Sequence, residues 1–552
     1  MNYLIIGGVA GGATVAARLR RLDENANIII FEKGAHISYA NCGLPYYIGG
    51  TIAERNSLFL QTPTTFGNRF DADVRVNTEV IAIDREKKKV ICRNLANGKE
   101  YSENYDKLVL SPGTFAVRPS IPGIDAPNIF VLRDIPDTDA IKTFTDQLSG
   151  NKRAVVVGAG FIGLEMTENL RHCGCQVALV EKAPQILPPV DWEIAAPVQK
   201  HLCDNGVQLF VNDEVTEFLH HDNAITVNLQ SGTQLEADFV LVSIGVKPLV
   251  KLAQDAQLAI GTHGGIDVNE YMQTSDPDIY AVGDAVETLH PLTGNKQLCF
   301  LAGPTNKQAR ICANNIALGN QQKYQGAIGT AIAKVFDMTV GRTGLSEMQL
   351  QKLGIPYLVS ITHTGSHAAY YPGSTPVSIK LQFSPTDGAL LGAEVCGKEG
   401  VDKRLDILAD TIAHRGTIYD LTEFDHAYAP PFSAPKDPIT MAGFAAENIL
   451  TGKVNVLQWH ELQQMMKNGE DILLIDVRSL LENRAGSIEG AENYPLDELR
   501  EYAEDMDPKQ KTVIFCAIGL RGYIACRILM QMGFENVYNL AGGITTWQTC
   551  AK

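Results

Sequence analysis

The sequence predicts an α/β protein with two nucleotide-binding domains, followed by two further domains. An apolar strand, a glycine-rich turn and an amphipathic helix occur at the start of the chain and again near residue 155. A new alternation of apolar strands and helices then begins near residue 457. The 552 residues have room for three or four domains, because a domain typically holds roughly 100–200 residues.

The first unit opens the chain with YLIIGGVAGGATVAARLRRL, and the strand NIIIFEKG follows it. Glycines let the backbone approach a pyrophosphate, and the acid that ends the second strand accepts a hydrogen bond from a ribose hydroxyl. This order is typical of dinucleotide binding, although Val9 stands where the middle glycine is expected. The candidate cofactor residues are Gly7, Gly11, Gly12 and Glu32.

The second unit, RAVVVGAGFIGLEMTENL followed by QVALVEKA, fits the pattern without a departure. Two such units in the same context are much stronger support than one glycine motif. The carboxylate of Glu181 would repel a 2′-phosphate, so we expect NADH, while the neighbouring Lys182 leaves NADPH open. The candidate cofactor residues are Gly158, Gly160, Gly163 and Glu181.

A third element, IYAVGDAVE, places Gly283 and Asp284 at the end of an apolar strand. Asp284 could bind the ribityl chain of a flavin, with the next helix facing the flavin pyrophosphate. An ordinary helix N-cap is the alternative for Asp284 alone.

In this order the motifs resemble the flavoprotein disulfide reductase superfamily over about residues 1–445. The resemblance implies FAD and NAD(P)H, with a hydride passing from the nicotinamide to the flavin and electrons then reaching a cysteine. It implies an FAD-binding domain at 1–115 and 250–325, an NAD(P)H-binding domain at 116–249 and an α+β dimerisation domain at 326–445. Both nucleotide-binding domains would be Rossmann-like.

The stretch SYANCGLPYYIGG contains one cysteine, Cys42, and no second cysteine nearby. It resembles the single-cysteine branch of the superfamily, which includes coenzyme A-disulfide reductases, NADH oxidases and NADH peroxidases. The resemblance implies that the Cys42 thiolate is oxidised to a mixed disulfide in the first group and to a sulfenic acid in the other two.

A basic stripe on the first helix favours the coenzyme A group. Three polar residues lie at i, i+4 and i+7, beside an apolar stripe that we expect to pack on the sheet. Guanidinium groups and a hydroxyl suit a phosphate-rich ligand, whereas a solvated basic face is the alternative. The candidate coenzyme A residues are Thr14, Arg18 and Arg21 on the helix, with Ser38 and Asn41 beside the cysteine.

Three later segments also resemble coenzyme A-disulfide reductases. HAYAPPFSAPKDP contains Tyr428 and Lys436, AAYYPGS contains Tyr370 and Tyr371, and GPTNKQAR contains Asn306. The resemblance implies a homodimer in which a partner tyrosine approaches the active-site sulfur, while Lys436 and Asn306 contact the coenzyme. We favour Tyr370 over Tyr371, and ordinary interface packing is the alternative for both. A tyrosine hydroxyl would stabilise a leaving thiolate.

After a linker at 446–456, residues 457–552 resemble an α/β rhodanese domain. In the loop CAIGLR, Cys516 ends an apolar strand and Arg521 lies at the start of a helix. Backbone amides and the helix dipole favour a thiolate or a persulfide there. The loop is one residue tighter than a phosphatase loop, so we expect sulfane-sulfur transfer; a catalytically inactive scaffold is the alternative. Ser487 replaces the usual histidine, a departure that concerns folding more than chemistry.

Composition narrows the function further. The net charge of −16 argues against nucleic-acid binding, and the sequence contains neither a membrane-length apolar run nor signal-peptide features at its start. An odd number of scattered cysteines, 11 in all, fits a cytoplasmic location. We expect no metal, and interpret Cys173, Cys175 and Cys526 as structural.

We therefore expect a cytoplasmic homodimer that uses NADH, FAD and Cys42 to reduce coenzyme A persulfide, polysulfide or coenzyme A disulfide. Cys516 would accept sulfur from a donor such as polysulfide or thiosulfate and pass it to coenzyme A or towards Cys42. Two alternatives stay open. One is an NADH oxidase or peroxidase that uses a Cys42 sulfenic acid, and the other is a redox sensor or sulfur carrier with little turnover.

Overall fold

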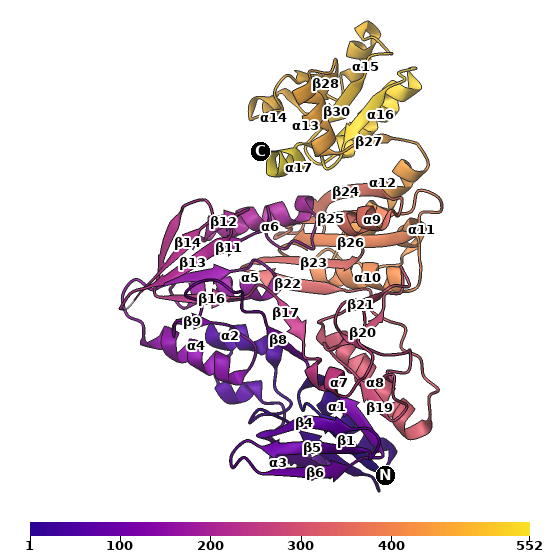
Figure 1. Cartoon of the computed structure of the whole chain (residues 1–552). Coiled ribbons are helices and arrows are strands. Elements are labelled where there is room, and N and C mark those ends of the chain that lie inside the picture. The colour runs from indigo at the N-terminus through magenta and orange to yellow at the C-terminus, as the bar shows by residue number, and fades with distance from the viewer. Residues whose placement is uncertain (223, 552) are drawn as a thin grey trace. The chain divides into compact units, whose positions relative to one another are not determined.

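The computed structural model describes residues 1–222 and 224–551 and divides into two units (Figure 1). Unit 1 contains residues 1–186 and 206–329, and unit 2 contains residues 187–205 and 330–552. Among the described residues, no helix is both long enough and apolar enough to cross a membrane.

Unit 1 begins with a parallel sheet of five strands in the order β19-β7-β1-β2-β3. The central strand β1 is buried along almost its whole length, as the apolar run at the start of the chain predicts. Helix α1 (Ala10–Leu22) follows β1, and α8 (Ala302–Leu318) lies beside α1 (Figure 1). The strands are β1 (Asn2–Ile6), β2 (Asn27–Phe31), β3 (Asp73–Arg75), β7 (Lys107–Leu110) and β19 (Ile279–Ala281).

A second parallel sheet in unit 1 has the order β12-β11-β10-β16-β9. The β10–β11 pair of this sheet repeats the β1–β2 pair of the first sheet, since both pairs are parallel. Helix α5 (Phe161–His172) follows β10, and α4 (Ile135–Gln147) belongs to the same domain. The strands are β9 (Ile129–Phe130), β10 (Arg153–Val157), β11 (Gln176–Glu181), β12 (Gln208–Val211) and β16 (Phe239–Val242).

Smaller sheets complete unit 1, and one of them corrects a sequence prediction. The alternative of a helix N-cap at Asp284 is wrong, because the next residues form a strand that pairs with two neighbours, and the following helix, α8, begins only at Ala302. The sheets are β4 (Thr78–Asp84), β5 (Lys89–Asn94) and β6 (Glu100–Asn104); β8 (Thr114–Ala116) and β17 (Val246–Pro248); β13 (Val215–His220), β14 (Ile225–Leu229) and β15 (Gln234–Ala237); and β18 (Ile266–Asp267), β20 (Val286–Leu289) and β21 (Lys296–Leu298).

Unit 2 contains an antiparallel sheet in the order β22-β23-β26-β25-β24. One continuous helix, α12, spans Pro438–Leu450 and so crosses the domain boundary predicted at residue 445. The strands are β22 (Ala331–Val335), β23 (Met338–Gly344), β24 (Leu358–Gly365), β25 (Pro376–Phe383) and β26 (Leu390–Gly397). The other helices of this part are α6 (Trp192–Asp204), α9 (Glu347–Leu353), α10 (Val401–Ala413) and α11 (Ile418–Glu423).

The C-terminal part of unit 2 is a parallel sheet in the order β27-β31-β30-β28-β29, with helices around it (Figure 1). The buried strand β30 (Thr512–Phe515) leads directly into Cys516. The other strands are β27 (Asn455–Leu457), β28 (Leu473–Asp476), β29 (Glu492–Asn493) and β31 (Val537–Leu540). The helices are α13 (Trp459–Asn468), α14 (Leu480–Arg484), α15 (Leu499–Tyr502), α16 (Leu520–Gln531) and α17 (Gly543–Cys550).

Candidate active sites

The two predicted nucleotide sites have the same construction. In the first, the Glu32 carboxylate at the end of β2 accepts hydrogen bonds from the backbone amides of Gly8 (2.8 Å) and Gly34 (2.7 Å). In the second, Glu181 at the end of β11 accepts them from Ala159 (2.7 Å) and Ala183 (2.8 Å). Each carboxylate is therefore held beside its glycine turn, where the sequence predicts a ribose contact.

The glycine turns have the close approach that a pyrophosphate requires. A Cβ atom on Gly12 would lie 1.8 Å from the carbonyl oxygen of Gly7, so a side chain cannot be placed there. A Cβ on Gly160 would instead point into open space at the N-terminus of α5. The residues present thus fit two dinucleotides, because the backbone amides at both helix starts can face a phosphate.

Asp284 lies just after β19 with its carboxyl group partly buried. Burial raises the pKa of Asp284, while the guanidinium of Arg133 and a hydrogen bond from Thr305 oppose the rise. The Gly283 amide donates a 2.8 Å hydrogen bond to the Gln308 side chain and so fixes the turn. A partly buried carboxyl group at this position fits the hydroxyls of a ribityl chain.

Cys42 belongs to a short 3-10 helix at Asn41–Gly43, where its side chain reaches the surface but is surrounded by protein on its other sides. Its surroundings disfavour the thiolate: partial burial and the carboxylates of Glu165 and Asp284 raise the pKa of Cys42. Beside the cysteine, the side-chain oxygen of Asn41 is buried and makes no hydrogen bond to any described residue. A buried acceptor without a partner fits a ligand that donates a hydrogen bond there.

Glu165 is a neighbour of Cys42 that the sequence did not reveal. It lies on α5, and Tyr46 donates a 3.4 Å hydrogen bond to its carboxylate. Burial raises the pKa of Glu165 to about 7, with a further rise from Glu168, while the Tyr46 hydrogen bond opposes it. The glycine motif places this residue on the helix, but only the folded chain brings it near a cysteine more than a hundred residues earlier.

Two residues of the basic stripe, Thr14 and Arg18, are half-buried and bond to α8, whereas Arg21 is exposed and donates a 2.8 Å hydrogen bond to the Ala17 carbonyl of its own helix. The Thr14 hydroxyl donates to Asn306 (2.8 Å), and Arg18 donates to Asn314 (2.9 Å). Partial burial and the charges of Arg310 and Arg21 lower the pKa of Arg18. The structure thus gathers Thr14, Arg18 and Asn306, which the sequence singled out, and adds Arg310, which it did not.

Ser38 connects the cysteine loop to the first glycine turn. Its amide donates a 2.9 Å hydrogen bond to the Gly8 carbonyl, and its φ of 46° lies in the left-handed region. The backbone is therefore fixed at the start of the segment that carries Cys42.

Unit 2 contains the two predicted tyrosines, and they form a pair. The hydroxyls of Tyr370 and Tyr428 lie 2.9 Å apart, and this hydrogen bond raises the pKa of Tyr428. The Tyr370 side chain is 73% exposed. Tyr371 instead packs edge-on against His367 with ring centroids 5.6 Å apart, so the pairing favours Tyr370.

A buried ion pair holds the segment that carries Tyr428 and Lys436. Asp437 and Arg404 are almost completely buried and are joined by a 2.7 Å hydrogen bond. Ser433 donates to the same carboxylate at 2.5 Å. Lys436, next to Asp437, stays exposed and free to reach an anionic ligand.

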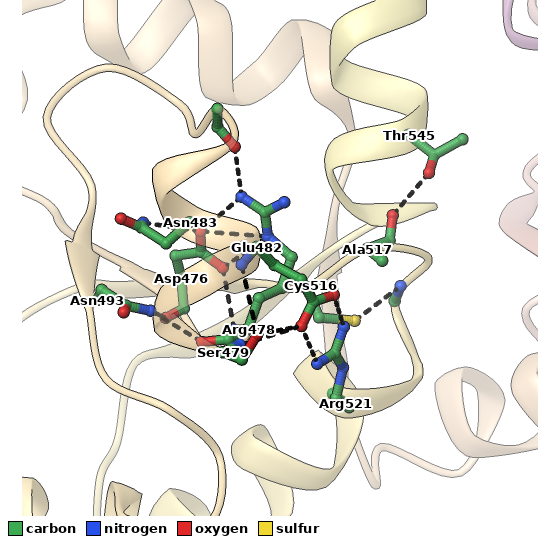
Figure 2. A network of polar contacts seen from close by, with 12 residues as sticks. Asp476, Arg478, Ser479, Glu482, Asn483, Asn493, Cys516, Ala517, Arg521 and Thr545 are labelled. Atoms are coloured by element: carbon green, nitrogen blue, oxygen red, sulfur yellow. Dashed lines mark hydrogen bonds and ion pairs between the residues drawn. The ribbon is translucent and has the colours of Figure 1, made fainter.

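The second sulfur site surrounds Cys516, which is fully buried. The Gly519 amide donates a 3.2 Å hydrogen bond to its sulfur, and α16 begins directly afterwards (Figure 2). The loop carbonyls of Cys516 and Ala517 accept hydrogen bonds from the amides of Ile544 (2.9 Å) and Thr545 (3.1 Å) at the start of α17. The loop is therefore held at both ends, and one amide faces the sulfur, as the predicted cradle for a thiolate or a persulfide would require.

Side chains around the Cys516 loop form the network drawn in Figure 2. Arg521 donates two hydrogen bonds to the Glu482 carboxylate, at 2.6 and 2.8 Å. A buried pair lies beside it, in which Arg478 donates to Asp476 at 2.7 Å. Ser487 also donates to Asp476 (2.9 Å), so the residue in place of the usual histidine has a structural role.

The remaining cysteines named from the sequence have structural surroundings. Cys173 follows α5, and its thiol donates to the Ile48 carbonyl at 3.2 Å. Cys175 and Cys526 are buried in apolar cores. Over residues 1–222 and 224–551, no group of three or more His, Cys, Asp or Glu residues could hold a metal ion.

Fold and sites together define a flavoprotein-type reductase with an added sulfurtransferase-type domain. The family model described as pyridine nucleotide-disulphide oxidoreductase matches residues 1–302, and the dimerisation domain of the same family matches residues 330–438. A rhodanese-like domain model matches residues 458–550. The chain belongs to the pyridine nucleotide-disulphide oxidoreductase family.

Individual relatives resemble most or all of the chain. It is similar to the coenzyme A disulfide reductase of Staphylococcus haemolyticus, with 36% identity over 81% of this chain and 100% of the relative. Reduced Bacillus anthracis CoADR-RHD has 46% identity and a TM-score of 0.96, covering 100% of this chain and 98% of that one. A NAD-dependent persulfide reductase from A. fulgidus has 36% identity and a TM-score of 0.93, covering 99% of this chain and 100% of that one.

Proposed function

We propose that this protein is an NADH-dependent flavoprotein that reduces coenzyme A disulfide or coenzyme A persulfide at Cys42, with a rhodanese domain that handles sulfane sulfur. The observation that carries the proposal is the cluster of Thr14, Arg18 and Asn306 in the same unit as Cys42. Similar proteins are named coenzyme A disulfide reductase and NAD-dependent persulfide reductase, and these names agree with the proposal.

The chain's own residues support a simple reaction sequence. The Cys42 thiolate attacks one sulfur of the substrate, so a Cys42–substrate disulfide forms as the substrate S–S bond breaks. The electron pair of that bond leaves on a thiolate, and the Tyr370–Tyr428 pair gives it a proton. When bound, FAD and NADH supply the two electrons that break the Cys42–substrate disulfide, so that Cys42 returns to its thiolate and the bound half of the substrate leaves as a second thiol.

Several residues would hold the ligands. The glycine turns with Glu32 and Glu181 fit FAD and NADH respectively, and Asp284 fits the flavin ribityl chain. NADPH is the alternative cofactor, because Lys182 could bind its 2′-phosphate. The Lys182 ammonium makes an ion pair with Glu214 at 2.8 Å. The coenzyme would be bound by Thr14, Arg18, Arg21, Ser38, Asn41, Asn306 and Lys436.

The tyrosine pair supports a homodimer. It is exposed in unit 2, together with Phe432, which is 71% exposed. Exposed aromatic side chains are typical of surfaces that another protein covers. We infer that the pair of one subunit acts at Cys42 of its partner, and that the enzyme is cytoplasmic.

The second candidate, an NADH oxidase or peroxidase, has weaker support. The water-forming NADH oxidase from Lactobacillus brevis has 26% identity and a TM-score of 0.79, and it covers 82% of this chain. Reduction of oxygen or peroxide also does not require Arg18, Arg21 and the Thr14 hydroxyl, a set that suits a phosphate-rich ligand.

Intact-mass analysis of the purified protein tests the proposal. We expect coenzyme A on Cys42 after incubation with coenzyme A disulfide, its loss on addition of NADH, and no adduct in the Cys42→Ser variant. Stopped-flow turnover of coenzyme A disulfide or persulfide should exceed peroxide turnover. Faster turnover with peroxide, or an adduct that survives Cys42→Ser, would overturn the proposal.

A further inference from the structure

One face of strand β24 in the dimerisation domain contacts the rhodanese-like domain. Val359, Ile361 and His363 alternate along this strand, so their side chains point to the same side of the sheet. Val359 and Ile361 pack on Ala541, which is buried just after β31. The contact is therefore apolar along most of its length, and His363 is its polar member.

The His363 ring is held between two hydroxyl groups. Its Nδ1 lies 2.7 Å from the hydroxyl oxygen of Ser378, the residue opposite it on β25, and its Nε2 lies 2.9 Å from the hydroxyl oxygen of Thr546 on α17. His363 and Thr546 are both buried. Burial lowers the pKa of His363 to about 4, so the ring is neutral at neutral pH, and one nitrogen can donate while the other accepts.

The backbone of Gly542 and Gly543 passes between the histidine ring and the Cys516 loop. A Cβ atom on Gly542 would lie 2.8 Å from Nε2 of His363, and one on Gly543 would lie 2.4 Å from the carbonyl oxygen of Cys516. The φ angles of the two glycines, 66° and 60°, lie in the left-handed region that glycine adopts without strain. The start of α17 is thus packed against His363 on one side and against the sulfur loop on the other.

This helix start also holds the carbonyl groups of the Cys516 loop. Amides in the first turn of a helix have no partner within it, and the Ile544 amide donates to the Cys516 carbonyl at 2.9 Å. Thr545 donates twice to the Ala517 carbonyl, from its amide at 3.1 Å and from its hydroxyl at 2.8 Å (Figure 2). Because these carbonyls point to α17, amides further along the loop can turn to the sulfur, as the Gly519 amide does at 3.2 Å.

We propose that His363 is a positioning residue for sulfur transfer at Cys516: it holds Thr546 and the start of α17, which in turn sets the loop so that an amide faces the sulfur. His363 belongs to the dimerisation domain, so the reductase part of the chain supports the reactivity of the second sulfur site. The inference rests on the proposed function, because it assigns a residue to the sulfur transfer named there.

The reaction to measure is the transfer of one sulfur atom from glutathione persulfide to Cys516 in the full-length protein. The Cys516 thiolate attacks the terminal sulfur, the S–S bond of the donor breaks, and its electron pair leaves on the glutathione thiolate. Peptide mass spectrometry follows the persulfide on Cys516 separately from any persulfide on Cys42.

Thr546→Val removes the hydroxyl and keeps the shape of the side chain. It should slow the transfer about three- to tenfold at neutral pH, the effect of losing one hydrogen bond. The pH dependence of Cys516 alkylation should shift to higher pH, because an amide that no longer faces the sulfur stabilises the thiolate less. At alkaline pH the thiol is ionised in both proteins, so the alkylation rates should converge. A merely loosened domain would instead expose the thiol and speed alkylation at every pH.

Two substitutions of His363 separate its bond to Thr546 from its bond to Ser378. The side-chain amide of glutamine can take the place of Nε2, whereas the shorter side chain of asparagine reaches only the place of Nδ1. His363→Gln should therefore retain most of the transfer rate, and His363→Asn should reduce it as much as Thr546→Val does. In the double variant His363→Asn with Thr546→Val the losses should not add, because both changes remove the same hydrogen bond.

Thr549→Val is the matched control on the same helix. The Thr549 hydroxyl donates to the Thr545 carbonyl at 2.7 Å, a bond within α17. The same change of side chain there should leave the transfer to Cys516 within about twofold of the wild type.

The inference fails if transfer and alkylation of Cys516 are unchanged in Thr546→Val, or if Thr549→Val causes an equal loss. NADH-dependent reduction of coenzyme A disulfide should keep its wild-type rate in all these variants, and a parallel loss there would mean general destabilisation and also contradict the inference. If the wild-type protein does not reduce coenzyme A disulfide, the proposed role of Cys42 is wrong. If it transfers no sulfur to Cys516, the proposed sulfur handling is wrong. In either case the alkylation profiles still decide the role of His363.

Discussion

The two sulfur sites of this chain support a thiolate in opposite ways. Around Cys516 the backbone does so: the Gly519 amide donates to the sulfur, and the start of α16 adds its dipole. Around Cys42 the described groups oppose it, because partial burial, Glu165 and Asp284 all raise the pKa of the thiol.

This difference indicates how each site is completed. The Cys516 cradle is local, so sulfur transfer there depends on one loop and the helices that hold it. Cys42 lies among acids, so we infer that its thiolate depends on the flavin and on the cations that bind the substrate. The comparison leads to three predictions, taken from the largest effect to the smallest.

The first prediction separates the two thiols. Cys42→Ser should abolish NADH-dependent reduction of coenzyme A disulfide, a loss of at least about a thousandfold, since no other described group can replace the nucleophile. Cys516→Ser should leave that reaction unchanged and abolish reactions that begin with a sulfur donor. Steady-state NADH oxidation with each substrate measures both.

Equal losses from the two substitutions with coenzyme A disulfide would contradict the division of roles. Turnover of about one NADH per flavin in the wild-type protein would favour the redox sensor instead.

The same contrast explains what the sequence could predict. The Cys516 loop and both glycine turns are local patterns, so Gly160 and Glu181 could be assigned from a few neighbouring residues. The surroundings of the two candidate residues depend on long-range packing: Glu165 reaches Cys42, and Arg310 reaches Arg18, from helices far along the chain. No local signal gives those contacts.

The failure of the N-cap alternative for Asp284 has a similar cause. Residues 286–289 are mostly apolar or β-branched, and this composition suits a strand that finds two partners. Those partners are β18 and β21, and only the second is close in sequence. Glu482 was also missed, because its capping box is local but its contact with Arg521 is not.

The second prediction concerns proton supply. Tyr428→Phe should slow coenzyme A disulfide reduction about a hundredfold, because a positioned proton donor contributes at least this much. The effect should shrink with an aryl disulfide, whose leaving thiolate needs no proton. Sulfur transfer to Cys516 should not change, since the groups that bond its sulfur are the Gly519 amide and Arg521, and not a tyrosine.

Tyr371→Phe is the matched control for this prediction, because Tyr371 packs on His367 and lies outside the tyrosine pair. If it slowed the reaction as much as Tyr428→Phe, the pair would have no special role. A loss from Tyr428→Phe that is independent of the leaving group would assign the hydroxyl to binding instead.

The third prediction tests the acidic surroundings of Cys42. Because the Glu165 charge raises the pKa of the thiol, Glu165→Gln should lower that pKa. The rate of Cys42 alkylation at neutral pH should then rise about two- to fivefold. The pKa of Glu165 is about 7, so below that pH its carboxyl is protonated and the difference between variants should narrow. At alkaline pH the Cys42 thiol is ionised in the wild-type protein and in the variant, so the two alkylation rates should converge.

Peptide mass spectrometry can follow both cysteines in one sample, so Cys516 is the internal reference and its alkylation profile should not move. Glu79→Gln is the control for general charge, because Glu79 pairs with Lys33 on the surface and is not among the groups that shift the pKa of Cys42. If the pH dependence of Cys42 alkylation is the same in Glu165→Gln as in the wild type, burial alone sets the pKa of Cys42. The contrast with Cys516 would then be one of solvent access and not of charge.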